Sequence, residues 1–235
     1  MKKLILLSLL SLNIHASVNY DQLSQLKEAI YLAFDELKPD SSHSLSINQK
    51  VGDLESYWWD LDIVHASYSG VEQDGLFSHN IFLFGGFARL DGMTLDGLAL
   101  TACHEIGHGI GGLPLKVNGK TMEGQADYYA TQTCLPILFK YLKQADELST
   151  DPYIEYFCKS HTDYSYCQRA MTALESEIFF FSYLGDETSF EERSTEVVTE
   201  LNTSETYYPS AQCRLDTSMN GIFGLARPTC WFPKN

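Results

Sequence analysis

The sequence predicts an α+β fold in which a small antiparallel or mixed sheet packs on one central helix, and a mainly helical half follows. Three observations support this prediction. Apolar residues recur at helical spacing over 20–37, aromatic and β-branched residues are frequent over 44–90, and helical patterns return after residue 94. The composition, 44% hydrophobic and 20% charged, is that of an ordinary globular protein. We therefore expect a single folded domain over 17–235, with the sheet and central helix in 17–120 and the helical half in 121–235.

The first half of that domain contains one helix and the strands. Apolar residues of 20–37 share one face of a helix that Pro39 ends. Alternating, aromatic and β-branched residues then predict three strands, over 44–51, 56–68 and 79–90. Gly85 and Gly86 interrupt the last strand and indicate a bulge or a close backbone approach.

The second half is expected to be mainly helical. One helix should begin at Thr94, a suitable N-cap residue with Asp96 in the first turn behind it, and end in the glycines of 109–112. Two more helices are expected over 122–142 and 167–183. Residues from 203 onward are rich in turn formers, and we expect them to form a tail pinned by disulfides.

Residues 1–16 have the pattern of a secretory signal peptide. Lys2 and Lys3 precede a short apolar run over 4–12, and Ala16 supplies a small residue before a plausible cleavage point. The run is shorter than the about 20 residues that span a bilayer, and no later segment is a candidate transmembrane segment. We therefore expect an exported protein, periplasmic or extracellular.

The net charge of the chain is strongly negative. It is −15 for the whole chain, and loss of Lys2 and Lys3 with the signal peptide would take it to −17. Such a surface argues against nucleic acid and anionic membranes as partners. The charge does not identify a substrate, and the sequence leaves the oligomeric state unknown.

Six cysteines follow the expected signal peptide, which is typical of disulfides in an oxidising compartment. They allow fifteen connectivities. We favour the two local pairs and the remaining one, which are Cys158–Cys167, Cys213–Cys230 and Cys103–Cys134. The last pair would join the helix that begins at Thr94 to the helix over 122–142.

The motif His104-Glu105-Ile106-Gly107-His108 lies within the helix that begins at Thr94. A step of four residues advances a helix by about 40° and 6 Å, so both imidazoles leave one face and can bind one ion. Zinc binds neutral imidazole, and its catalytic sites leave one coordination position open. Glu105 is then the expected general base, next to the metal without binding it.

The third ligand distinguishes two types of zinc site. In the longer pattern HExxHxxGxxH, Gly111 fits, but Pro114 occupies the position of the third histidine and cannot bind zinc. Glu123, fifteen residues after His108, can instead complete a His₂Glu site for one catalytic Zn²⁺. Asp127 shares a helical face with Glu123 and is expected to accept a hydrogen bond from a ligating histidine.

HExxH followed by ExxxD on a second helix resembles the gluzincin clan of zinc peptidases, and the segment 123–130 resembles its small members in particular. The resemblance covers about 82–136, and the connection between the two helices is shorter than usual. It implies hydrolysis of protein or peptide substrates by a zinc-activated water. It also implies that the strand before the HExxH helix, residues 80–89 here, pairs with an extended substrate.

Further expectations concern the remaining polar residues. The resemblance implies an oxyanion donor from later in the chain, and the candidates are His161, Tyr164, Tyr208 and Arg214. His65 and His79 are interpreted as structural. Three alternatives to a peptidase stay open: a zinc-holding binding module, a structural zinc site and an amidase acting on cell-wall material. A structural site usually has four protein ligands, and the sequence offers three.

Overall fold

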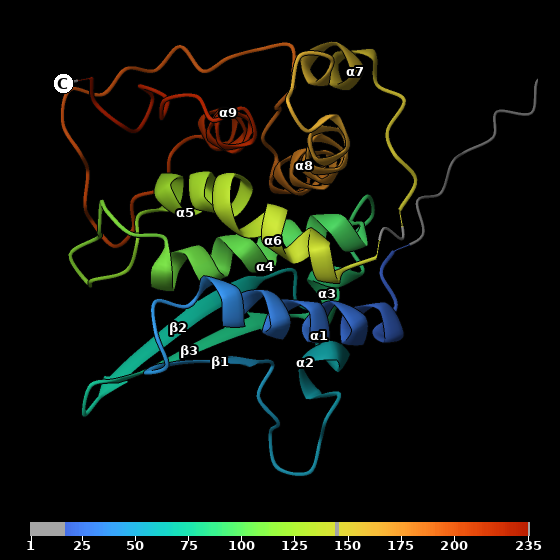
Figure 1. Cartoon of the computed structure of the whole chain (residues 1–235), viewed down its shortest axis with the longest axis vertical. Coiled ribbons are helices and arrows are strands. Elements are labelled where there is room, and N and C mark those ends of the chain that lie inside the picture. The colour runs from blue at the N-terminus through green and yellow to red at the C-terminus, as the bar shows by residue number, and fades with distance from the viewer. Residues whose placement is uncertain (1–16, 144–145, 235) are drawn as a thin grey trace, which may run out of the picture.

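The computed structural model describes residues 17–143 and 146–234, so the expected signal peptide lies outside the described residues. The described chain has the expected α+β fold (Figure 1). Its three strands form one mixed sheet in the order β1-β3-β2. Strand β3 (Leu76–Leu83) lies in the centre, parallel to β1 (His43–Ile47) and antiparallel to β2 (Ala66–Gln73).

Helix α4 (Leu95–Ile110) lies at the centre of the fold, between the sheet and the later helices (Figure 1). It contacts β2 and β3 on one side, α5 (Glu123–Tyr129) and α8 (Tyr164–Leu184) on the other, and α1 (Tyr20–Leu37) at its flank. The other helices are α2 (Tyr57–Asp60), α3 (Gly85–Ala88), α6 (Leu135–Tyr141), α7 (Pro152–Cys158) and α9 (Ala211–Ile222). A π-helical segment, Ala130–Cys134, joins α5 to α6.

Local sequence signals explain where α4 begins and how closely it packs. The Thr94 side chain accepts a hydrogen bond from the Gly97 N–H, as expected of an N-cap residue. A Cβ atom on Gly97 would lie 2.3 Å from the Ser176 side chain, and one on Gly107 would lie 3.0 Å from the Ala126 backbone. Because these two glycines lack side chains, α8 and α5 can pack directly against the backbone of α4.

The six cysteines form the three expected disulfides. Cys103–Cys134 joins α4 to the π-helical segment, Cys158–Cys167 joins α7 to α8, and Cys213–Cys230 joins α9 to the C-terminal residues. Trp231, next to the last pair, is fully buried, and its indole N–H donates to the Thr217 hydroxyl at 3.0 Å. The tail is therefore held to the helical half by covalent and packing contacts.

Two of the strand predictions are wrong in part. Residues 57–60, expected within a strand, form α2, and β2 begins only at Ala66. Aromatic residues favoured a strand here, but their rings pack against neighbouring elements. The ring centroids of Trp58 and Phe82 are 4.7 Å apart, and those of Trp59 and Tyr20 are 5.5 Å apart. The predicted strand over 79–90 is β3, which begins earlier, at Leu76, and ends at Leu83.

The strand ends there because the backbone approaches another segment closely. A Cβ atom on Gly85 would lie 1.7 Å from the Trp59 carbonyl oxygen, and one on Gly86 would lie 2.5 Å from the Ile63 nitrogen. The expectation of a close approach at these glycines is confirmed.

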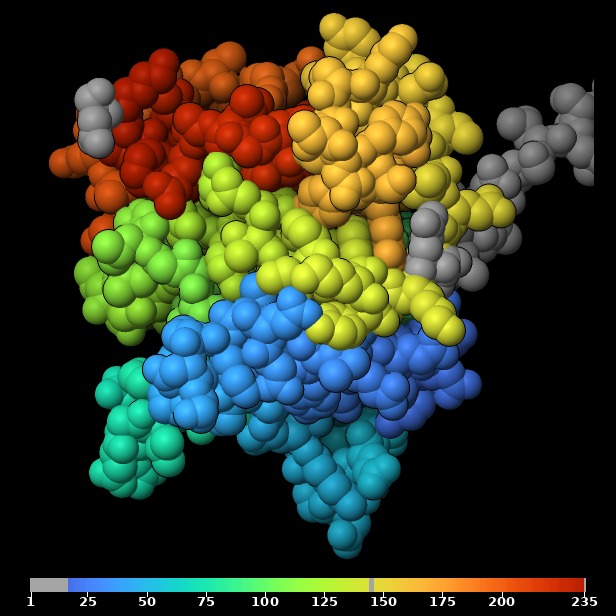
Figure 2. Space-filling view, in the orientation of Figure 1, coloured from blue at the N-terminus to red at the C-terminus, as the bar shows by residue number. Residues whose placement is uncertain are grey.

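The prediction that residues 80–89 form the substrate-pairing edge is also wrong. Strand β3 lies between β1 and β2, so both of its edges are already hydrogen-bonded. Strand β2 has one edge that no described strand pairs with, and it is the edge nearest α4. Its tip and the loop over 48–56 project from the body of the molecule (Figure 2).

The helical half also differs in detail from the expectation. The segment 122–142 is helical but divided by the π-helical segment, and the tail from 203 onward contains α9, which the turn-forming residues concealed. Within the described residues, no helix is long and apolar enough to span a membrane.

Candidate metal centre

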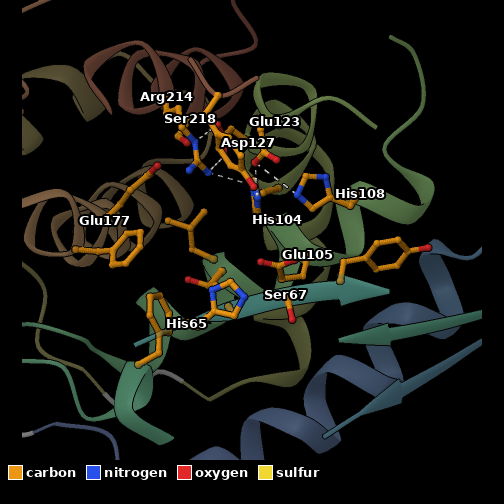
Figure 3. A pocket seen from close by; sticks show the side chains of 18 of the residues that line it. His65, Ser67, His104, Glu105, His108, Glu123, Asp127, Glu177, Arg214 and Ser218 are labelled. Carbon is orange, nitrogen blue, oxygen red and sulfur yellow. Dashed lines mark hydrogen bonds and ion pairs between the residues drawn. The ribbon is translucent and has the colours of Figure 1, made fainter. Parts of the chain in front are cut away.

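The side chains of His104, His108 and Glu123 converge at one point between α4 and α5 (Figure 3). Glu123 Oε2 lies 3.3 Å from His104 Nε2 and 3.5 Å from His108 Nε2. One ligand atom from each residue falls within 4.8 Å of the others, so the three could hold one metal ion. The two histidine rings are 4.6 Å apart and nearly perpendicular.

Helix geometry accounts for this convergence. His104 and His108 are one turn apart on α4, and Glu123 is the first residue of α5. The close approach of Ala126 to Gly107 places the start of α5 beside the two histidines. Glu123 is buried, with 2% of its surface exposed, so its carboxylate has little access to water.

The outer nitrogen of each histidine is hydrogen-bonded to an acceptor. His104 Nδ1 lies 2.7 Å from Asp127 Oδ1, and His108 Nδ1 lies 2.9 Å from the Thr121 carbonyl oxygen. Both contacts require a proton on Nδ1, so in the neutral, metal-binding form of each ring the Nε2 lone pair is directed at Glu123. Three acceptor atoms then face one another, and a bound cation would relieve their repulsion. The residues present therefore fit a divalent metal ion of the kind that zinc sites hold.

The charges around the site lead to the same conclusion. Burial would lower the pKa of His104, but Asp127 and Glu123 outweigh burial and raise it to about 10. Burial would raise the pKa of Glu123, but the two histidines hold it well below its usual range. The protein therefore strongly favours positive charge at this point.

Arg214 on α9 anchors Asp127. Its Nη2 donates to Asp127 Oδ1 at 2.7 Å and its Nε donates to Oδ2 at 2.9 Å, a bidentate pair. Asp127 thus links His104 to Arg214 of α9, which lies 87 residues after Asp127 in the chain. The partner predicted for Asp127 is a metal-site histidine, and His104 Nδ1 lies at hydrogen-bonding distance from Asp127. The second partner, Arg214, is thereby part of the site.

The structure separates the four candidate oxyanion donors. Tyr208 and Arg214 line the same pocket as the metal-site residues. His161 instead contacts the carbonyl oxygens of Asp163 and Ile222, and neither His161 nor Tyr164 lines the pocket. Burial and the charge of Glu123 raise the pKa of Tyr208, so this tyrosine is a protonated donor at neutral pH.

Lys116 is a site residue that the sequence interpretation missed. Its Nζ donates to Glu123 Oε1 at 2.7 Å and to the Glu205 carbonyl oxygen at 3.3 Å, and it lies 4.8 Å above the Tyr208 ring. The hydrogen bond from Lys116 engages Oε1 of Glu123 and leaves Oε2 facing the two histidines. No motif singles out a lysine in a connecting loop, so the signal exists only in the folded chain.

The metal-site residues lie in a cavity of about 470 Å³. Glu105 is buried and points into this cavity beside the two histidines (Figure 3). Residues 65–68 line the opposite wall; His65, expected to be structural, is exposed there just before β2. His79 is buried on β3 and hydrogen-bonded to His43 and Tyr68, as expected of a structural residue. No family model, curated protein or solved structure matches the chain.

Proposed function

We propose that the protein is an exported zinc-dependent peptidase of the gluzincin type. The observation that carries the proposal is the His104–His108–Glu123 cluster with Glu105 beside it in one cavity. The three disulfides support export, since such bonds persist in oxidising compartments.

The side chains support a division of roles. His104, His108 and Glu123 would hold Zn²⁺, which when bound lowers the pKa of a coordinated water and polarises a carbonyl group. Glu105 would accept a proton from the attacking water and then deliver it to the leaving amine. Tyr208 and Arg214 would donate hydrogen bonds to the carbonyl oxygen on which negative charge develops.

The unpaired edge of β2 is suited to hold an extended substrate. Ala66, Ser67 and Tyr68 line the pocket, and a peptide added to this edge would lie across the face of α4 that carries the motif. Lys120 Nζ already donates to the Tyr68 carbonyl oxygen at 3.0 Å, so the edge is partly covered at that residue. The substrate strand is therefore expected to begin at Ala66 and Ser67.

Glu105 also favours an enzyme over a module that only holds zinc. A binding module needs the metal ligands but no base, whereas here a carboxylate is buried next to them and directed into the cavity. A purely structural site would use four protein ligands, and the described residues supply three.

Hydrolysis and zinc content, measured together, test the proposal. The purified protein is incubated with a mixture of peptides, with and without a chelator, and new termini are sequenced. Glu105→Gln should retain stoichiometric zinc and lose about 10²–10⁴-fold in rate, because an amide cannot accept the proton. A Glu105→Gln protein that cleaves as fast as the parent, or a parent that needs no metal, would contradict the proposal.

A further inference from the structure

The cavity extends from the metal ligands into an apolar region between α4 and α8. Side chains of both helices, of α3 and of the segment between α3 and α4 form its walls, namely Phe87, Met93, Leu100, Phe180, Phe181 and Leu184. Glu177 of α8 ends this region, on the same side as Arg214 and Ser218 and across the cavity from His65 and Ser67 (Figure 3). The carboxylate of Glu177 therefore lies at the end of a region whose walls are aromatic and aliphatic side chains.

One oxygen of this carboxylate has no partner. Glu177 Oε2 is buried and has no hydrogen-bond partner among the described residues. Arg214, whose charge acts on Glu177, directs its Nε and Nη2 to Asp127. Burial and the charge of Asp127 raise the pKa of Glu177 to about 7. A buried acceptor that lacks a donor carries a desolvation cost that a ligand with a donor group can remove.

We propose that this region is a specificity subsite for a side chain with an apolar stem and a cationic end, the lysine or arginine of a peptide next to the bond that is cut. The inference rests on the proposed peptidase function and adds the substrate class to it. The stem would lie among the aromatic and aliphatic walls, and the ammonium or guanidinium group would donate to Glu177 Oε2.

Other side chains fit this region less well. A purely aliphatic residue would fill the hydrocarbon walls but leave Oε2 buried without a donor. An acidic residue would meet the carboxylate of Glu177, and Arg214 at the same end of the cavity is already paired with Asp127. The net charge of −15 adds to the preference, because an acidic protein attracts cationic peptides over longer distances.

Binding of matched peptides to the Glu105→Gln protein tests this subsite without turnover. Two pairs of alanine-based hexapeptides carry lysine or norleucine directly before or directly after the central bond. Norleucine keeps the apolar stem and lacks the ammonium group. In one of the two pairs the lysine peptide should bind about 10- to 100-fold more tightly, the range of a hydrogen bond to a charged group.

A second substitution assigns that preference to Glu177. Added to Glu105→Gln, Glu177→Gln should bring the lysine-to-norleucine ratio to about one, and Glu177→Met should favour norleucine. Glu175→Gln, the same charge change on the same helix at a residue that accepts from Ser149, should leave the ratio unchanged. Circular dichroism verifies that each variant is folded.

The possible outcomes separate the two proposals. Equal or weaker binding of lysine in both pairs, or a preference that persists in folded Glu177→Gln and Glu177→Met, would overturn the subsite. Cleavage of the same peptides by the parent protein is measured separately. A lysine preference in binding without any metal-dependent cleavage would overturn the peptidase and leave the cationic subsite.

Discussion

Two pairs of histidines, one on helix α4 and one on the sheet, use their ring nitrogens differently. In His104 and His108 the outer nitrogens meet acceptors, and the inner nitrogens converge on Glu123 Oε2. In the second pair, His43 Nδ1 lies 2.9 Å from His79 Nε2, and His79 Nδ1 lies 2.8 Å from the Tyr68 hydroxyl. In the first pair both inner nitrogens face a carboxylate oxygen, which favours a proton or a metal ion between them, whereas in the second pair the rings satisfy each other.

The difference lies in the neighbouring acidic residues. Asp127 and Glu123 raise the pKa of His104 to about 10, whereas burial and His43 lower the pKa of His79 to about 4. Proximity of two histidines is therefore insufficient for a metal site. A carboxylate must fix the outer nitrogen, and a second one must complete the ligand set.

The largest expected effect comes from removing the carboxylate that completes the set. Glu123→Ala takes away one of the three candidate ligands that the described residues supply, so zinc affinity should fall by more than the about 100-fold typical of changes around the ligands. Metal content after dialysis against a weak chelator measures the loss. His79→Gln is the control and should retain stoichiometric zinc. Equal loss of zinc from both variants would contradict the conclusion that only the pair on α4 belongs to the metal site.

A smaller effect is expected from the carboxylate that fixes the outer nitrogen. Asp127→Asn should lower zinc affinity about 10- to 100-fold, because the amide is a weaker acceptor for His104 Nδ1.

Asp96 provides a matched control, since it forms a second buried bidentate pair. Arg169 Nε donates to Asp96 Oδ2 and Arg169 Nη2 donates to Asp96 Oδ1, each at 2.7 Å. Asp96→Asn should lower thermal stability without changing zinc affinity. If it weakens zinc as much as Asp127→Asn does, the loss reflects general destabilisation.

The second pair should be visible in the pH dependence of stability. The pKa of His79 is about 4 in the folded protein and about 6.5 when unfolded, so the unfolded chain binds more protons between these values. The free energy of unfolding should therefore fall as pH drops from about 6.5 to about 4, with a slope of at most about one proton from this residue. Denaturant titrations measure it, and a His79→Gln protein with the same slope would contradict the assignment.

The smallest expected effect tests the hydrogen bond between His79 and Tyr68 in the second pair. Tyr68→Phe removes the hydroxyl that His79 Nδ1 meets and should cost about 0.5–1.5 kcal/mol of stability, the net value of one hydrogen bond. Zinc affinity should not change, because Tyr68 lies outside the His104–His108–Glu123 cluster. Loss of zinc on this substitution would show that the two pairs are coupled through α4.

The sequence alone was sufficient for those parts of the protein that depend on helical spacing. His104 and His108 must share a face because four residues make about one turn, and the same holds for Glu123 and Asp127. Helix α4 begins after Thr94, which caps it, and ends in the glycines after residue 108, which have the backbone freedom to leave the helix. The three disulfides also followed from spacing, since the two local pairs left one possibility.

Tertiary structure decided which distant residues complete the site. Arg214 reaches Asp127 only because α9 packs on α5, and Lys116 reaches Glu123 only because the connecting loop folds back. The order β1-β3-β2 likewise made β2 the edge, whereas proximity along the chain had suggested β3. Periodicity reports which side chains share a face of one element. Which elements then meet depends on packing across many residues, and that packing brought Glu177 to the end of the apolar region of the cavity.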